Sequence, residues 1–201
     1  MHYWRQGYFE SLKAAAEASS PWPAYSNYCR QMDRGLRDEA FATLKLFIAS
    51  VERADFQVRR EFVSWLLAFA HHRDGSEVLI PYPLKTRIVE PTLSEWTLIE
   101  PQCAEPHRWI SDREHLEIAL NLDPSDQIAR KKLIIDLLRY IEYAGHELPA
   151  GYIGDAKKDL LILDRAEQLL RDVDDAELKK HLISDIQEER ATIEDYIRSR
   201  K

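Results

Sequence analysis

The sequence predicts a mainly α-helical protein, built as a helical bundle or as an irregular stack of helix hairpins. Three observations support this fold class. Apolar residues recur at three- and four-residue spacing along most of the 201-residue chain, which is the period of an amphipathic helix. Helix-capping signals precede several of these segments. Only residues 77–89 show a pattern typical of strands, and there we expect at most one small β-hairpin.

Residues 1–75 are predicted to form an N-terminal helical bundle. Pro21 and Pro23 end its first helix, because proline blocks the backbone hydrogen bonding of a continuing helix. The predicted helices of this region are residues 2–18, 25–33, 36–53 and 56–72.

Residues 76–91 differ from the helical segments on both sides. They are rich in β-branched residues and contain Pro81 and Pro83, which would confine a strand to a sheet edge. Two structures fit this pattern equally well. One is a small hairpin of residues 78–80 and 86–89, and the other is an extended connector between two helical layers.

Residues 92–201 are predicted to form a second helical region, unless the whole chain is one compact domain. Thr92 and Glu95 have the spacing of a capping box and open a short helix. Residues 101–106 are expected to form an extended loop that leads to Trp109. Residues 156–172 and 174–198 are predicted helices, the latter opened by a capping box of Asp174 and Glu177.

The stretch 111–144 is predicted to be a helix, a tight turn and a longer helix. Ser111 and Glu114 form a capping box at its start. Asp123 and Pro124 have the types preferred at the N-cap and at the first helical position, and Gly145 is a typical stop signal.

This stretch resembles the join between two tetratricopeptide repeats. The residues that carry the resemblance are Leu116, Ala119, Pro124, Leu133 and Leu137. In that family a small alanine lets two helices approach closely, and a proline ends one helix and starts the next. The resemblance covers about one repeat, a sixth of the chain, and Asp112 and Ile134 stand where the family has small residues. It implies a tetratricopeptide-like hairpin, and no regular array is indicated.

The charge distribution bears on the class of partner. The net charge is −7, and residues 76–201 carry 18 Lys and Arg against 26 Asp and Glu. Phosphate backbones require clustered cations, so nucleic acid is not expected as a partner. A partner protein with a basic face fits the acidic half better.

One basic grouping stands out, made of Arg30, Arg34, Arg37, Arg59 and Arg60. Tyr25 and Tyr28 lie near it, which is the composition of an RNA-binding patch. Asp33, Asp38 and Glu39 balance the charge and favour a solvated helix face instead.

Two cysteines, Cys29 and Cys103, are too few for a disulfide framework. The first residues contain no apolar signal segment, and no apolar run is long enough to span a membrane. We therefore expect a cytoplasmic protein without membrane contact.

No motif points to catalysis, a metal or a cofactor. His146 and Glu147 begin like a zinc-protease motif, but its second histidine would stand at position 150, which is Ala150. Cys103 and His107 have the spacing of two ligands on a helix, but Pro106 argues against that helix and no second pair follows. Glycine-rich phosphate loops and serine nucleophile motifs are absent.

The leading hypothesis is a non-enzymatic protein–protein interaction module. One version of it is an inhibitor or immunity-type protein that masks a basic partner. The alternative is an enzyme with a site between the helical halves that uses His146, Glu147 or His107. The residues expected to bind a partner are Arg108, Trp109, His146, Glu147, Tyr152, Asp185 and Glu189. The sequence does not indicate an oligomeric state.

Overall fold

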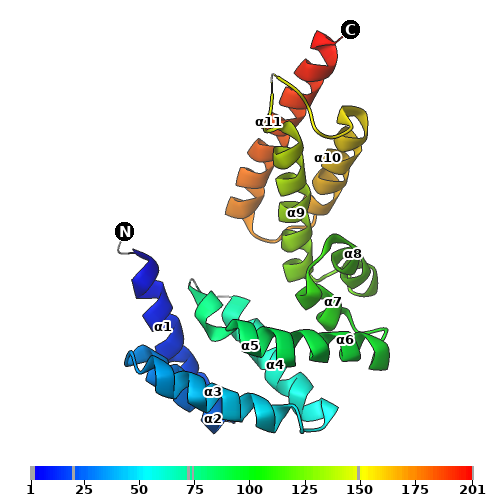
Figure 1. Cartoon of the computed structure of the whole chain (residues 1–201). Helices are drawn as coiled ribbons and strands as arrows, with labels where there is room; N and C mark the ends of the chain where they lie inside the picture. Colours follow the sequence, from blue (N-terminus) through cyan, green and yellow to red (C-terminus); the bar gives the residue numbers. More distant parts are fainter. Residues whose placement is uncertain (1–2, 20, 72, 74, 149, 201) are drawn as a thin grey trace. The chain divides into compact units, whose positions relative to one another are not determined.

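The computed structural model describes residues 3–19, 21–71, 73, 75–148 and 150–200, with side chains described from residue 7 onward. Every regular element in these ranges is helical, so the prediction of a mainly α protein is confirmed (Figure 1). The chain divides into two compact units, Met1–Pro101 and Gln102–Lys201, which we call the N-terminal unit and the C-terminal unit.

The N-terminal unit has an aromatic core. Its elements are α1 (Tyr3–Ala18), α2 (Pro23–Asp33), α3 (Arg37–Val51), α4 (Phe56–His71), the 3-10 helix η1 (Ser76–Leu79), α5 (Tyr82–Leu84), the π-helix η2 (Lys85–Val89) and α6 (Glu90–Ile99). The fully buried Tyr25 ring contacts Phe47, Phe62 and Trp65 at centroid distances of 5.7, 5.3 and 5.8 Å. Its hydroxyl donates to the Leu79 carbonyl at 2.7 Å, which satisfies a polar group inside the core.

Residues 76–91 form helical turns, so the expectation of a hairpin or an extended connector is wrong. Pro81 precedes α5 and Pro83 lies in its first turn, where a missing N–H is tolerated. Val78 and Leu79 are buried, and their carbonyls accept hydrogen bonds from the hydroxyls of Tyr28 and Tyr25. Packing of η1 on α1 and α4, together with the tyrosine hydrogen bonds from α2, therefore decides the conformation, and the preference of β-branched residues for strands does not.

Gly75 provides the entry into this segment. Its φ is +66°, and an added Cβ would stand 2.7 Å from the Tyr8 backbone nitrogen. A side chain at this position would meet both a left-handed backbone and the close approach of α1. Thr92 lies inside α6, which begins at Glu90, so the predicted capping box is wrong.

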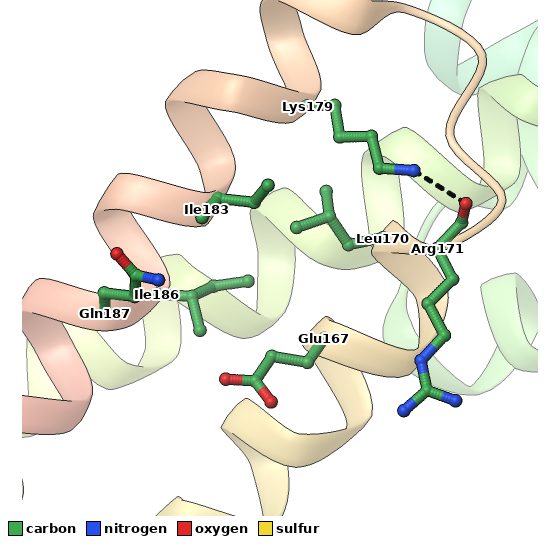
Figure 2. Close-up of a pocket in the computed structure, with 7 residues that line it drawn as sticks. All are labelled: Glu167, Leu170, Arg171, Lys179, Ile183, Ile186 and Gln187. Carbon is green, nitrogen blue, oxygen red and sulfur yellow. Dashed lines mark hydrogen bonds between the residues drawn. The ribbon is translucent and has the colours of Figure 1, made fainter.

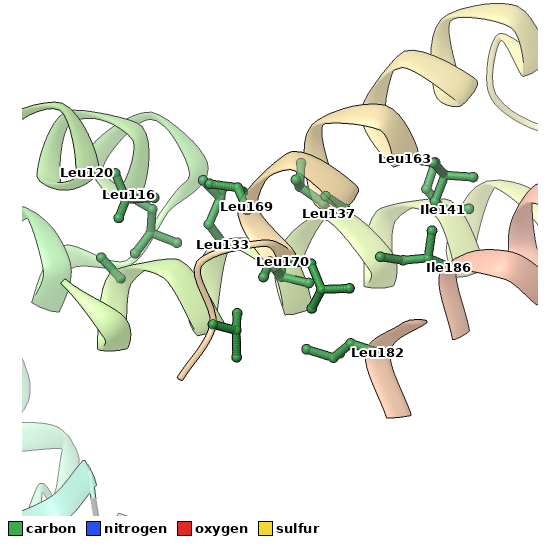
Figure 3. Close-up of a cluster of buried hydrophobic side chains, with 14 of the residues drawn as sticks. Leu116, Leu120, Leu133, Leu137, Ile141, Leu163, Leu169, Leu170, Leu182 and Ile186 are labelled. Carbon is green, nitrogen blue, oxygen red and sulfur yellow. The ribbon is translucent and has the colours of Figure 1, made fainter. Parts of the chain in front are cut away.

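The C-terminal unit contains two helix hairpins that pack against each other. Its elements are α7 (Ala104–Ile110), α8 (Arg113–Leu122), α9 (Gln127–Gly145), α10 (Ala156–Leu170) and α11 (Ala176–Ser199). Helix α10 packs on both α9 and α11, and α9 also contacts α11. The four helices α8 to α11 share one apolar core (Figure 3). The core residues labelled there are Leu116, Leu120, Leu133, Leu137, Ile141, Leu163, Leu169, Leu170, Leu182 and Ile186.

Helix α7 was not predicted, because its segment was expected to form an extended loop. Pro106 stands near its start, where proline is accepted, and the helix ends at Ser111 with φ +68°. Ser111 therefore ends α7 and does not cap α8.

The predicted caps of the later helices are displaced by one to three residues. Asp112 caps α8 and accepts from the His115 N–H at 2.8 Å. Asp126 caps α9 and Asp175 caps α11, where Asp123 and Asp174 were expected. Each predicted residue has an acidic neighbour that has the same capping chemistry, and the chain geometry selects between them.

Ala119 tests how closely α8 and α9 approach. The side chain is fully buried in the shared core, so replacement by leucine would overpack it. Ala119→Leu is expected to reduce the free energy of unfolding of the C-terminal unit by about 1–3 kcal/mol. Chemical denaturation measures this loss. Ala191→Leu, on the exposed face of α11, is the control, and equal stability of the two variants would contradict the close packing.

Candidate functional site

A groove of about 490 Å³ lies between α10 and α11 on the surface of the C-terminal unit. Figure 2 shows Leu170, Ile183 and Ile186 directed into the space between the two ribbons. Polar side chains border this apolar floor. They are Glu167, Arg171, Lys179 and Gln187.

Two polar contacts hold the walls of the groove together. The Lys179 Nζ donates to the Arg171 carbonyl at 2.7 Å, where α10 ends. Further along α11, Arg190 Nη2 donates to Asp164 Oδ1 at 2.7 Å and to Glu167 Oε1 at 3.1 Å. These contacts link α10 and α11 on both sides of the apolar floor and so hold the groove in place.

Ile183 is the feature of this groove that the helix packing does not explain. Ile186 is buried, and Leu182 on the preceding turn is also buried, yet Ile183 is 40% exposed. Ile183 adjoins the core stripe but lies on the α10 side of α11. A β-branched apolar side chain in an open groove is a typical anchor position for an apolar group of a ligand or partner.

The predicted acidic residues Asp185 and Glu189 lie on the opposite flank of α11 from the groove. They stand four residues apart, so they share a face. Burial raises the pKa of Glu189, and the nearby carboxylates of Glu142, Glu188 and Asp185 raise it further. The folded state therefore holds a cluster of like charges between α9 and α11.

The loop between α9 and α10 is anchored through Tyr152. The Tyr152 hydroxyl donates to Asp159 Oδ2 at 2.9 Å, and its ring lies 5.5 Å from that of Tyr196. Burial and the Asp159 contact raise the pKa of Tyr152 well above its ordinary value. A Cβ on Gly154 would collide with the Asp159 carboxylate, so the loop requires glycine there. Tyr152 thus serves to close this end of the unit.

His146 and Glu147 are the exposed part of the same loop. The His146 Nδ1 lies 2.6 Å from the Tyr143 carbonyl, and its Nε2 lies 3.1 Å from Glu147 Oε1. The ring stacks on Tyr143 with a centroid distance of 5.2 Å. Tyr143 is 62% exposed, so these residues present a small aromatic and polar surface.

Arg108 and Trp109 contribute to packing at the start of α9. Arg108 Nη1 donates to Asp126 Oδ2 at 3.1 Å. The Trp109 side chain is 9% exposed, and the Lys132 Nζ lies 4.6 Å from its ring centroid. Burial lowers the pKa of Lys132 to about 8, and the charge of Arg108 lowers it as well. Little of the Trp109 ring is left for a partner.

The three residues of the enzyme alternative are not brought together. His107 is buried, with its ring 5.2 Å from that of His115, near the start of α8. Burial lowers its pKa, as does the charge of His115. His146 and Glu147 follow the end of α9 instead. In the parts of the chain that the structure describes, no three His, Cys, Asp or Glu residues are placed to hold a metal ion.

The sequence pointed to Tyr152 and to the pair Asp185 and Glu189 as two separate candidate surfaces, and the groove between α10 and α11 was not predicted. The structure relates these residues, because the charge of Glu189 acts on Tyr152. The signal for the groove in the sequence was Ile183, an apolar residue of α11 that lies outside the buried stripe of Leu182, Ile186 and Ile193. None of the helices in the described residues combines the length and the apolar character needed to cross a membrane.

No protein-family model, curated protein or solved structure matches this chain.

Glu189 gives a test of the acidic flank that does not need a partner. The pKa of Glu189 is raised in the folded state, so ionisation of this side chain destabilises the fold. The protonated side chain carries no such cost below the ordinary glutamate pKa. Stability is therefore lost as the pH rises through the pKa that Glu189 has in the folded state. Glu189→Gln is therefore expected to be more stable than the parent at pH 7, with the difference vanishing below about pH 4. Unfolding curves at several pH values measure it.

The control for this measurement is Glu194→Gln, an exposed position on the same helix. If both variants change stability equally and with the same pH dependence, the neighbouring carboxylates do not raise the pKa of Glu189.

Proposed function

We propose that the C-terminal unit is a non-enzymatic protein-binding module, and that its α10–α11 groove takes an apolar side chain of a partner protein that carries a basic face. The observation that carries the proposal is the apolar floor of the groove. It contains Ile183, which is 40% exposed although the helix core is complete without it. Exposed apolar surface with a polar rim is characteristic of protein-binding sites.

The size of the groove supports one anchor residue. A volume of about 490 Å³ exceeds that of any single side chain, so a leucine, phenylalanine or tryptophan could enter with part of its backbone. Buried aromatic and aliphatic anchors supply most of the binding energy in protein interfaces. The polar residues at the rim would then exclude water around the anchor.

The charge of the unit supports a basic partner. Residues 102–201 carry 16 Lys and Arg against 22 Asp and Glu. The acidic flank of Asp185 and Glu189 lies on the other side of α11 from the groove, so its contribution would be long-range attraction that accelerates encounter. An inhibitor or immunity-type protein, which masks a basic toxin or enzyme, is the version of this function that combines both features.

The arrangement of the helices also supports kinship with tetratricopeptide-like scaffolds. Hairpins α8–α9 and α10–α11 pack in sequence, as successive hairpins do in such stacks. Glu117 of α8 accepts two hydrogen bonds from Arg165 of α10, at 3.1 and 2.6 Å. Such stacks bind other polypeptides through extended surfaces, which agrees with a module of this kind.

The groove is tested by Ile183→Glu, which places a charge on its floor. The parent, Ile183→Glu and a matched control are each used to capture proteins from the native cell lysate, with quantitative mass spectrometry as the readout. The control is Leu161→Glu, because Leu161 is 65% exposed on α10 and does not line the groove. We expect at least one protein that the parent and the control retain and that Ile183→Glu loses by about tenfold or more, about 1.4 kcal/mol.

Equal capture by all three proteins would place the interface elsewhere, with Tyr143 and His146 as the next surface to test. If the parent protein itself retains no protein from the lysate above background, the proposed function is contradicted.

The acidic flank is tested by the double reversal Asp185→Lys and Glu189→Lys, with the partner identified by capture. The association rate is expected to fall by about tenfold at low salt, and the difference should shrink as salt is raised, because exposed charges are screened beyond about 10 Å at 0.1 M. Stopped-flow measurements at several salt concentrations record this. An unchanged rate would mean that the acidic flank serves only solubility.

A further inference from the structure

A second groove lies in the N-terminal unit, between α1 and α2, with a volume of about 500 Å³. This lies within the range of roughly 300–1,000 Å³ that small-molecule sites occupy. Helix α1 contributes Lys13, Ala16 and Glu17, and α2 contributes the opposite wall. This wall is formed by Pro23, Ser26, Arg30 and Asp33 of α2 and by its C-cap residue, Arg34.

A buried contact fixes the register of the two walls. The Ser26 hydroxyl donates to the Ala16 carbonyl at 2.6 Å, and Ser26 is 3% exposed. Lys13 stands about one turn before Ala16 on α1, Arg30 stands about one turn after Ser26 on α2, and both line the groove. Arg34 follows Arg30 by about one turn on the same side of the groove.

The cations of this groove are not neutralised by the protein. Lys13, Arg30 and Arg34 form no ion pair with any residue that the structure describes, although Glu17 and Asp33 line the same groove. In the same unit some arginines are paired with carboxylates, whereas the exposed Arg53 forms no ion pair with any described residue. Arg59 bonds Glu95 at 2.7 Å, and Arg87 bonds Glu52 at 2.6 Å.

We propose that this groove binds a soluble small molecule that carries a phosphate group. Lys13, Arg30 and Arg34 share the groove with Glu17 and Asp33, so its lining carries a net charge of about +1 and attracts an anion. Two guanidinium groups one turn apart present planar forks that suit phosphate oxygens. The Glu17 carboxylate, one turn after Lys13 on α1, accepts hydrogen bonds from hydroxyl or amine groups of the ligand. This site is independent of the protein-binding function proposed above.

The test uses inorganic phosphate, ribose 5-phosphate and ribose as probes, titrated into the full chain at low chloride concentration. Backbone amide chemical shifts in NMR spectra give the affinity and the location. We expect saturable shifts centred on α1 and α2, tighter binding of ribose 5-phosphate than of inorganic phosphate, and no binding of ribose. Arg30→Ala combined with Arg34→Ala is expected to weaken binding at least tenfold.

Arg53→Ala is the matched control, since Arg53 is an exposed arginine of the same unit outside the groove. It should bind the probes as the parent does. Glu17→Gln, which removes a negative charge from the groove, should bind inorganic phosphate more tightly than the parent. Circular dichroism unfolding confirms that each variant is folded.

Three results would overturn the proposal. One is equal affinity of the parent and the double arginine variant, which would make these arginines a solvated helix face. Another is a set of shifts spread over all basic residues, including Arg53. The last is sedimentation of the parent with vesicles of phosphatidic acid and phosphatidylcholine without any binding of the soluble phosphates, which would assign the cations to a membrane surface.

Discussion

The C-terminal unit depends on one buried arginine. The Arg130 side chain is 7% exposed, donates to the Pro124 carbonyl in the α8–α9 turn, and donates to the Leu169 carbonyl at 3.3 Å near the end of α10. A guanidinium near the end of α10 interacts favourably with the negative end of that helix's dipole. Asp172 Oδ2, at 3.5 Å, partly balances the buried charge. The arginine therefore fixes the second hairpin against the first.

Neighbouring side chains at the start of α9 add further contacts, both to the α10–α11 turn and to α7. Gln127 donates to the Asp172 carbonyl at 3.0 Å and accepts from the Asp174 N–H at 3.2 Å, so the two turns of the hairpins are held side by side. Asp126 caps α9 and also pairs with Arg108, which docks α7. The position of the α10–α11 groove follows from these contacts, because they set where α10 ends and where α11 begins.

Local signals in the sequence located the longer helices, but they did not locate α7, the caps of the later helices or the helical turns of residues 76–91. The spacing of apolar residues in a helix depends only on which face is buried. It can therefore be recognised in the sequence without knowing which helix packs against that face. The choice between Asp123 and Asp126 as a cap depends on where the turn is placed, and Arg130 decides that through a carbonyl the sequence pattern does not reveal. Residues 78 and 79 are helical because the hydroxyls of two tyrosines, 50 and 54 positions away in the sequence, donate hydrogen bonds to their carbonyls.

The candidate sites were harder to predict for a different reason. A groove arises from the register of two helices, and that register comes from contacts such as Ser26 with Ala16 or Lys179 with Arg171. Composition predicted a basic grouping around Arg30, but it treated Arg59 as equivalent to Arg30 and Arg34. The structure separates them, because Arg59 pairs with Glu95 while Arg30 and Arg34 line an open groove. Exposed ion pairs contribute little to stability, so a folded chain can leave arginines unpaired without a large loss. Their placement in a groove next to Lys13, rather than their unpaired charge alone, is what distinguishes a binding site from a solvated surface.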